Sequence, residues 1–320
     1  MTFTSRLIRG LAAGVVAAGL VAAAHADAPM AKTQAPGYYR LMLGDFEVTA
    51  LFDGAIDLHP TKLLTNTTPK QVVKLLDRSF EKEPLATSVN AYLVNTGSKL
   101  VLVDAGTGGF FGPALGGLVN NLKAAGYQPE QVDEIYITHM HADHLGGLAA
   151  EGKAVFANAV VRADKHDADF WLDPAQADKA PADMKDFFKA ATSSLAPYVS
   201  AGRFKPFDGD TELVPGVKAV AARGHTPGHS VFMVESKGQK LALWGDLMHV
   251  GAVQFPHPEV TIQFDTDSKA AAAQRKKAYA DAAKGRYLVA AAHLPFPGIG
   301  HLRAEGKGYA FVPLSYTPVK

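Results

Sequence analysis

Three histidines and one aspartate stand within six residues of this chain, at His139, His141, Asp143 and His144. The cluster directly follows the apolar run Ile135-Tyr136-Ile137, which is typical of a buried strand. Imidazole nitrogens and carboxylate oxygens are common metal ligands. Histidines two residues apart can converge on one ion if the chain turns after them, and the Asp-His pair then faces a second position. The pattern therefore predicts a site for two metal ions.

The chain has no cysteine, so every metal ligand must be nitrogen or oxygen and no disulfide can stabilise the fold. Two divalent cations are expected, with zinc favoured. The ligand types also suit manganese, iron and cobalt, and do not choose among them.

The first 26 residues have the pattern of an export signal. Arg6 and Arg9 form a basic start, residues 11–24 are apolar, and Ala24-His25-Ala26 is a small-x-small cleavage site. We expect cleavage after Ala26 and a periplasmic or secreted protein with no membrane association. A retained membrane anchor is the alternative, which the short and weakly hydrophobic stretch disfavours.

Residues 27–320 are roughly 290 residues, enough for one large α/β domain or two small ones. Because no Pro/Ser/Gly-rich linker divides them, we expect a single domain. The 32 Lys and Arg residues balance 31 Asp and Glu residues. This balance gives no reason to expect nucleic acid or an anionic membrane as a partner.

Strand-like and helix-like segments alternate along the chain, which is typical of the α/β class. A turn is expected at Asp53-Gly54, after the first strand. Residues 164–200 are helical in pattern and aromatic, and this insertion is expected to form a lid or a pocket wall. The expected strands are 46–52, 88–95, 99–103, 132–138, 217–222, 230–235, 241–244 and 287–292, and the expected helices are 71–80, 114–125 and 268–284.

Four of the expected strands end in a residue that can bind metal. The residues that follow these strands are His139 with His141, then His225, Asp246 and His293. Strand ends are rigid, and the loops that leave them can bring distant residues to one cleft. The four sites together therefore predict one shared metal centre.

With these residues the chain resembles the metallo-β-lactamase superfamily, whose His-x-His-x-Asp-His signature corresponds to residues 139–144. The resemblance implies an αββα sandwich with two metals at one edge of its sheets. It implies a first ion bound by His139, His141 and His225, and a second bound by Asp143, His144 and His293. Asp246 would bridge the two ions.

Two further residues near the centre are assigned by the same resemblance. In Gly224-His225-Thr226-Pro227-Gly228-His229, it makes His225 the ligand and His229 a neighbouring structural group. Asp104 is expected to orient a histidine by accepting its second N–H, with a turn-capping role as the alternative. His249 lies three residues after Asp246 and is expected to face the pocket.

Within the superfamily, the chain resembles the exported methyl parathion hydrolases and their dihydrocoumarin-hydrolysing lactonase relatives. No cysteine is available to complete a lactamase-type second site, and no length remains for a flavin domain. The segments that carry this resemblance are Phe111-Gly112-Pro113-Ala114-Leu115, residues 128–139, Ala163-Asp164 with Phe170-Trp171-Leu172, and residues 293–301.

The resemblance also indicates the substrate pocket. Phe111, Trp171 and Phe188 are expected to form its aromatic wall, with core packing as the alternative for each. His249, Ile262 and Phe264 differ from the phosphotriesterase pattern, as does the region of Leu64. These differences favour a lactone or an aryl ester as substrate, with phosphotriester hydrolysis as a weak side activity.

The expected reaction is attack by a metal-bridging hydroxide, in which Asp143, Asp246 and His249 take part. Asp143 or His249 could protonate the leaving group. One alternative is a primary organophosphate hydrolase. Others are an iron sulfur dioxygenase with a single metal, for which Asp143 and His144 would not be ligands, and a non-catalytic periplasmic binder. The family resemblance also implies a homodimer.

Overall fold

We describe the protein from a computed structural model, in which residues 28–319 are described. The expected signal peptide, residues 1–26, lies outside them. A compact unit spans Pro36–Lys320, and the architecture below is that of this unit. Among the described residues, no helix is both long and apolar enough to cross a membrane.

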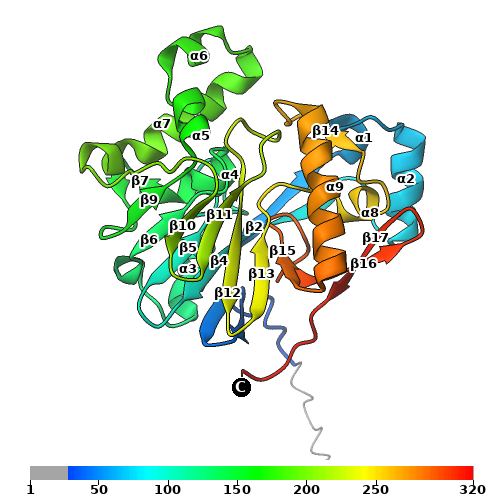
Figure 1. Cartoon of the computed structure of the whole chain (residues 1–320), viewed down its shortest axis with the longest axis horizontal. Helices are drawn as coiled ribbons and strands as arrows, with labels where there is room; N and C mark the ends of the chain where they lie inside the picture. Colours follow the sequence, from blue (N-terminus) through cyan, green and yellow to red (C-terminus); the bar gives the residue numbers. More distant parts are fainter. Residues whose placement is uncertain (1–27, 320) are drawn as a thin grey trace, which may run out of the picture. The chain divides into compact units, whose positions relative to one another are not determined.

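The first sheet has six strands in the order β1-β2-β4-β5-β6-β9 (Figure 1). Its strands β5, β6 and β9 run parallel, so their carboxyl ends lie at one edge of the sheet. Asp104 directly follows β5, and His139 lies three residues after β6. The strands are β1 (Tyr38–Leu43), β2 (Phe46–Leu58), β4 (Leu85–Asn95), β5 (Leu100–Val103), β6 (Glu134–Tyr136) and β9 (Val160–Arg162).

The second sheet has seven strands in the order β10-β11-β12-β13-β15-β16-β17. Strands β13 and β15 are parallel, and Asp246 and His293 each lie three residues after one of them. The strands are β10 (Thr211–Val214), β11 (Val217–Ala221), β12 (Ser230–Ser236), β13 (Gln239–Leu243), β15 (Leu288–Ala290), β16 (Ile299–Glu305) and β17 (Gly308–Pro313).

The turn expected at Asp53-Gly54 is wrong, because β2 continues through it to Leu58. The register with β4 shifts between Phe52 and Gly54, so the chain forms a bulge there and stays in the sheet. Asp53 turns its carboxylate into the protein, where it accepts hydrogen bonds from Thr107 and from the amides of Gly116 and Leu118. The Asp-Gly pair therefore lies in a strand bulge, where Asp53 binds the loop that runs from Thr107 to Leu118.

The described helices and short 3-10 turns lie mainly on the outer faces of the sheets. The expected helix 114–125 begins later, at Leu118, after two glycines. The expected insertion 164–200 contains α5, α6, η3 and α7. The helices are α1 (Pro60–Leu63), α2 (Pro69–Arg78), α3 (Leu118–Ala124), α4 (Ala142–Leu145), α5 (Lys165–Trp171), α6 (Pro174–Lys179), α7 (Lys185–Ser200), α8 (Gly251–Gln254) and α9 (Ser268–Gly285), with 3-10 turns η1 (Pro129–Gln131), η2 (Gly146–Leu148) and η3 (Ala182–Met184).

Three apolar cores separate four layers. The central core joins the two sheets, with Val101 and Tyr136 from the first sheet against Phe232 and Leu243 from the second. A second core packs the other face of the first sheet against α3, α5 and α7, and a third packs the second sheet against α9. This arrangement confirms the αββα sandwich that the resemblance implies.

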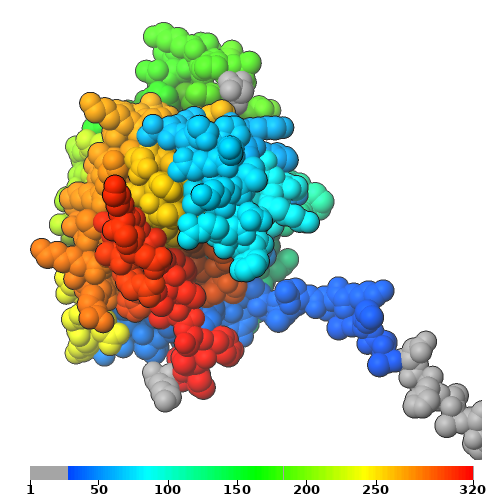
Figure 2. All heavy atoms as spheres, turned by 90° about the vertical axis from the view of Figure 1, so that its right-hand side faces the viewer, coloured from blue at the N-terminus to red at the C-terminus, as the bar shows by residue number. Residues whose placement is uncertain are grey.

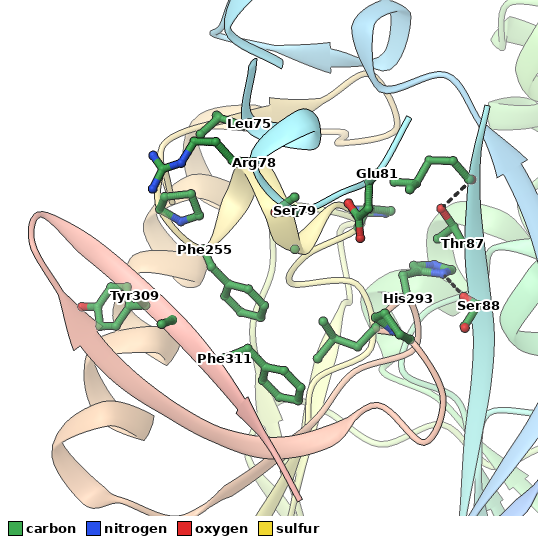
Figure 3. Close-up of a pocket in the computed structure, with 18 of the residues that line it drawn as sticks. Leu75, Arg78, Ser79, Glu81, Thr87, Ser88, Phe255, His293, Tyr309 and Phe311 are labelled. Atoms are coloured by element: carbon green, nitrogen blue, oxygen red, sulfur yellow. Dashed lines mark hydrogen bonds between the residues drawn. The ribbon is translucent and has the colours of Figure 1, made fainter. Parts of the chain in front are cut away.

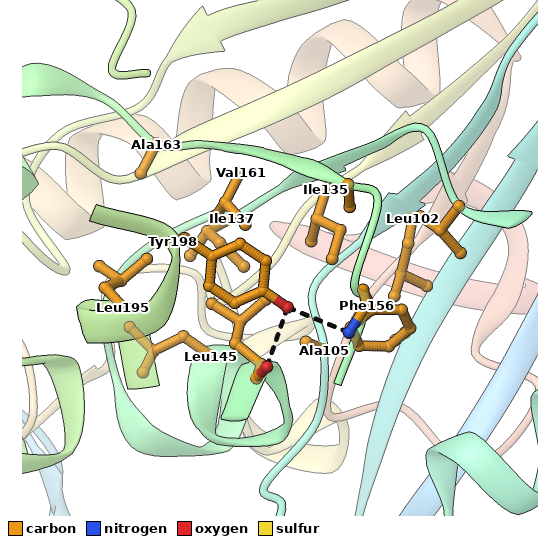
Figure 4. Packing of buried hydrophobic residues seen from close by; sticks show 14 of the residues in the cluster. Leu102, Ala105, Ile135, Ile137, Leu145, Phe156, Val161, Ala163, Leu195 and Tyr198 are labelled. Atoms are coloured by element: carbon orange, nitrogen blue, oxygen red, sulfur yellow. Dashed lines mark hydrogen bonds between the residues drawn. The ribbon is translucent and has the colours of Figure 1, made fainter. Parts of the chain in front are cut away.

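Figure 4 shows the outer core of the first sheet, where Ile135, Ile137 and Val161 pack against Leu195 of α7. Tyr198, also on α7, is fully buried in this core. Its hydroxyl accepts a hydrogen bond from the amide of Phe156 and donates one to the carbonyl of Leu148. The apolar residues before the histidine cluster thus hold the cluster on a rigid strand.

Candidate metal centre and substrate cavity

The residues predicted to bind metal come together at the carboxyl ends of strands from both sheets. In a first group, the ligand atoms of four buried side chains lie within 4.8 Å of one another. Nε2 of His225 lies 3.2 Å from Nδ1 of His141 and 3.4 Å from Oδ2 of Asp246. Nε2 of His139 lies 3.6 Å from the same carboxylate oxygen. The first group is His139, His141, His225 and Asp246.

A second group shares Asp246 with the first, and its ligand atoms also lie within 4.8 Å of one another. Nε2 of His144 and Nε2 of His293 each lie 3.2 Å from Oδ1 of Asp246. Both nitrogens lie 3.4 Å from Oδ2 of Asp143. The second group is Asp143, His144, Asp246 and His293.

Asp246 belongs to both groups, and histidines of both groups contact its carboxylate oxygens. The His139 and His225 contacts are to its Oδ2, while the His144 contact is to its Oδ1. Its side chain is almost fully buried. One carboxylate with an oxygen available to each group is the arrangement that a residue bridging two cations requires.

Several buried ligand atoms lack any hydrogen-bond partner, which tests whether the residues fit metal ions. They are Nε2 of His139, Nε2 of His144 and Oδ1 of Asp246. A buried polar atom without a partner is costly. A cation in each group would satisfy these atoms with a donor set of nitrogens and oxygens, so the residues fit two divalent ions.

In three of the histidines, His144, His293 and His225, the Nδ1–H points away from the metal position and donates a hydrogen bond to an oxygen atom. Nδ1 of His144 donates to Oδ2 of Asp104 at 2.8 Å, as expected for Asp104. Nδ1 of His293 donates to the carbonyl of Ser88 at 2.9 Å. With a cation bound, such contacts would keep the proton of each ring on Nδ1 and leave the lone pair of Nε2 directed at the metal position.

The partner of His225 was not identified from the sequence. Oδ1 of Asp265 accepts a hydrogen bond from Nδ1 of His225 at 2.8 Å, and both side chains are buried. Oδ2 of Asp265 accepts one from the amide of Ile262. Asp265 lies 40 residues from His225, and no local spacing signals the contact. Its only sequence signal is its place in the loop before a predicted helix.

His229 takes a structural position, as the resemblance implies. Its Nε2 accepts a hydrogen bond from the amide of Asp246 at 3.0 Å, and its Nδ1 donates to the carbonyl of Ala222 at 3.2 Å. Both ring nitrogens are therefore used. Burial, with a further contribution from His225, lowers the pKa of His229 to about 3, so the ring stays neutral. It orients the backbone of Asp246 and is not part of either group.

The pKa values of the ligands reflect the competition between burial and the carboxylates. Burial lowers the pKa of His225, but Asp246 and Asp265 raise it more strongly, to about 9. Burial also lowers the pKa of His144, and Asp246, Asp143 and Asp104 together raise it well above its usual range. In the absence of cations these carboxylates therefore retain protons on the imidazoles. Metal binding must displace those protons.

His249 lies beside the bridging carboxylate, with its Nε2 3.0 Å from Oδ2 of Asp246. Its ring stacks on that of His293, with the ring centres 5.2 Å apart. Both of its ring nitrogens are buried, and neither has a hydrogen-bond partner, because the contact with Asp246 is too poorly aligned to be a hydrogen bond. Burial lowers the pKa of His249, so the ring is neutral near pH 7 and has one N–H to donate.

A cavity of about 210 Å³ opens directly over the centre. Among the residues expected in the pocket, Phe111, His249 and Phe264 line it. Phe187 also lines it, where Phe188 was expected. The other lining residues are the apolar Ile56 and Leu58, together with Thr87, His141, Asp143, Asp246 and His293.

Four residues expected in the pocket belong to cores and do not line this cavity. Leu64 and Ile262 pair with each other in a two-stranded sheet formed by β3 (Leu64–Thr65) and β14 (Thr261–Ile262), and both are buried in a fourth apolar cluster. Trp171 and Phe188 pack together in the core of the first sheet, with ring centres 4.7 Å apart. Trp171 lies behind His141, at 5.3 Å between ring centres, and supports that ligand. A strand or helix pattern marks a residue as buried but does not say on which side it is buried.

A second cavity, of about 350 Å³, meets the first at Thr87, His249 and His293. We call it the rear cavity. Figure 3 shows Phe255, Phe311 and Tyr309 on one side of it and His293 on the other. In Figure 2 the segments that border it, α2 in cyan, α8 in yellow and the β16–β17 hairpin in red, lie side by side.

The comparisons with known proteins agree with this fold and site. The sequence profile of the metallo-beta-lactamase superfamily matches residues 85–293. This segment is more than half of the chain and contains both groups of ligands. The chain therefore belongs to the metallo-beta-lactamase superfamily.

One similar protein within the sequences compared is a lactonase. An N-acyl homoserine lactonase from Bacillus sp is 30% identical over 120 residues, which are 38% of this chain and 40% of that protein. The matched segment thus spans two fifths of that relative's length.

Two solved structures are similar over most of both chains. The hydrolase AbOPH, described as a member of the beta lactamase superfamily, is 40% identical with a TM-score of 0.85, covering 89% of this chain and 100% of its own. The dizinc quorum-quenching lactonase AidC is 28% identical with a TM-score of 0.82, covering 88% and 99%. Together with the two His/Asp groups, the dizinc relative supports a dinuclear metal site.

Proposed function

We propose that this protein is a dinuclear metal-dependent hydrolase that opens lactones and also cleaves aryl esters. The observation that carries the proposal is Asp246, whose two oxygens serve two adjacent groups of ligands. The lactonases among its relatives support lactones as the substrate class. A mononuclear iron sulfur dioxygenase fits less well, because Asp143 and His144 lie together with His293 in a second complete group.

Two bound cations would supply a water of lowered pKa and would polarise the carbonyl oxygen of the substrate. The residues of the chain provide the setting. Asp246 keeps the two groups adjacent, while Asp104, Asp265 and Ser88 hold three imidazoles in their orientations. The aromatic wall excludes water from the reacting carbonyl and binds the apolar part of the substrate.

The leaving oxygen needs a donor when it is an alkyl alkoxide, and the candidates are Asp143 and His249. Burial raises the pKa of Asp143, but His144 and His293 lower it well below its usual range, so Asp143 is ionised. His249 is neutral and has unpartnered ring nitrogens beside the cavity. We therefore assign His249 as the hydrogen-bond donor to the leaving oxygen.

The two cavities favour a lactone with an apolar substituent. The cavity over the centre, about 210 Å³, is smaller than the roughly 300–1,000 Å³ of most ligand sites. The rear cavity adds room beside His249, and its wall includes Leu294, Phe255 and Phe311. Phosphotriester hydrolysis is proposed only as a weak side activity.

The test is a comparison of kcat/KM for an N-acyl homoserine lactone, dihydrocoumarin, 4-nitrophenyl acetate and methyl paraoxon. Lactone turnover should exceed methyl paraoxon turnover, should disappear with a chelator and should return with added metal. Asp246→Ala and His293→Ala should each abolish it, because each removes a ligand that the second group needs. His301→Ala, a histidine on β16 that lines neither cavity, is the control.

Full lactone turnover in both ligand variants would refute the dinuclear hydrolase. A higher rate on methyl paraoxon than on any lactone would establish the phosphotriesterase in its place. Export from the cytoplasm and assembly as a homodimer stay predictions. They are tested by the N-terminal residue of the mature protein and by its mass in solution.

A further inference from the structure

One buried carboxylate has no part in the proposed chemistry, yet it contacts both loops of the first group. Asp167 lies on α5 and is fully buried. Within residues 28–319, no Lys, Arg or His nitrogen lies within ion-pair distance of it. Burial raises the pKa of Asp167 to about 6, although its hydrogen bonds act in the opposite direction. A buried acid without a cation is costly and needs another explanation.

The hydrogen bonds of Asp167 come from the two ligand loops. Oδ2 accepts the amide of Met140 at 2.9 Å and the hydroxyl of Thr226 at 2.9 Å. Oδ1 accepts the amide of Gly228 at 2.5 Å. Met140 stands between His139 and His141, and Thr226 directly follows His225.

The loop of His225 also approaches α5 very closely at Gly228. A Cβ on Gly228 would lie 2.4 Å from the backbone nitrogen of Asp167 and 2.9 Å from its Cβ. Only glycine lets the loop come close enough for its amide to reach the carboxylate. The hydrogen bond from the amide of Gly228 to Asp167 therefore depends on the absence of a side chain at position 228.

We infer that Asp167 is a positioning residue for the first metal group. Its carboxylate joins the loop of His139 and His141 to the loop of His225, so it sets the spacing of the three imidazoles. In the second group His144 and His293 are held by Asp104 and Ser88, and none of the residues that donate to Asp167 adjoins a ligand of that group. Asp167 thus acts on one of the two proposed ions.

An ionised carboxylate suits this position better than an amide. All three of its partners are donors, and a carboxylate is acceptor-only. In Asp167→Asn, an amide NH₂ of the same size would face at least one of these donors. The loops would have to separate to relieve that contact, and the imidazoles would move with them.

The experiment is metal binding by the whole chain, measured with zinc against a competing chelator and with cobalt by its absorption bands. For Asp167→Asn we expect the affinity of one ion to fall about 10- to 100-fold, the range for residues that orient ligands. The other ion should bind within about twofold of the wild type. The inference rests on the proposed dinuclear site but needs no substrate, so a failure of lactone hydrolysis would not affect it.

The matched control is Asp53→Asn. Asp53 is also a buried carboxylate, and all of its hydrogen-bond donors belong to one loop and its end. That loop bears no ligand of either group. Asp53→Asn should destabilise the protein while leaving both affinities within about twofold. Equal losses at both ions in Asp167→Asn, or wild-type binding of both, would overturn the inference.

Thr226→Val covers the case in which Asp167→Asn does not fold. Valine has nearly the shape of threonine but cannot donate the hydroxyl hydrogen bond to Oδ2 of Asp167. We expect a loss of severalfold at the same single ion. Unchanged binding of both ions in folded Thr226→Val would also contradict the inference.

Discussion

Oδ1 of Asp265 lies 2.8 Å from Nδ1 of His225, on the side of the ring that faces away from Asp246. The contact connects the first metal group to the loop before α9. That loop also carries Phe264, which lines the cavity over the centre. One loop thus supplies both a partner for a ligand and a wall for the substrate.

Asp265→Ala should weaken binding of the first ion about 10- to 100-fold, because the imidazole of His225 loses the acceptor that fixes its orientation. Zinc affinity against a chelator measures the effect. Asp267→Ala is the control from the same loop, since Asp267 only caps α9 through the amide of Ala270. It should cost about 1 kcal/mol of stability and leave metal affinity unchanged. Equal affinities in the two variants would contradict the role of Asp265.

His249→Leu should lower kcat for an N-acyl homoserine lactone about 100-fold or more, because leucine cannot donate a hydrogen bond to the leaving alkoxide. The rate on 4-nitrophenyl acetate should fall less than about tenfold, since a nitrophenolate leaves without protonation. Both rates are measured on protein whose metal content has been determined. Equal losses on both substrates, or loss of an ion, would argue against a leaving-group role for His249.

Neighbouring phenylalanines on α7 should respond differently to truncation. Phe188 is 3% exposed and packs on Trp171, so Phe188→Ala should cost about 3–5 kcal/mol in the free energy of unfolding. Phe187 lines the cavity, so Phe187→Ala should mainly raise KM and cost less stability. Denaturant titrations and steady-state kinetics on both variants check this. The opposite pattern would place Phe188 at the substrate.

Metal affinity should rise with pH from about 6 to about 9. The folded pKa of His225 is raised above its usual value, to about 9. In the metal-free protein the proton on His225 therefore adds stability below pH 6.5, and this stability is lost as pH rises through 9. Zinc must displace that proton, so binding at pH 7 should release protons. Calorimetry in buffers of different ionisation enthalpy measures the release, and its absence would contradict the prediction.

Blocking the rear cavity should select against long acyl chains. Ala310→Phe on β17 places a ring in that cavity and leaves the cavity over the centre unchanged. Each methylene that loses its contact costs about 0.8 kcal/mol, or about fourfold in kcat/KM. A decanoyl homoserine lactone should therefore lose at least about tenfold, while the butanoyl lactone changes little. Ala304→Phe, on β16 of the same hairpin and outside both cavities, is the control. An unchanged chain-length preference would exclude the rear cavity as the acyl site.

The sequence by itself determined the α/β class and the candidate ligands. Each of His139, His225, Asp246 and His293 lies within a few residues of an apolar strand, and that pattern is local in the chain. Hydrophobic periodicity marks strands, and strand ends are where rigid loops begin. The resemblance to a known family then supplied the grouping of the ligands into two sets.

Only the tertiary structure decided which side chains support and surround the centre. Asp265 and Asp167 reach the ligand loops across 40 and 59 residues of sequence, so no local spacing marks them. The resemblance placed Phe188, Leu64 and Ile262 at the substrate pocket, but the packing of neighbouring elements buries them in apolar cores. The bulge that carries β2 past Asp53 likewise depends on donors from a distant loop. Local patterns specify which residues are apolar or can bind metal, whereas contacts between distant segments specify what each of them touches.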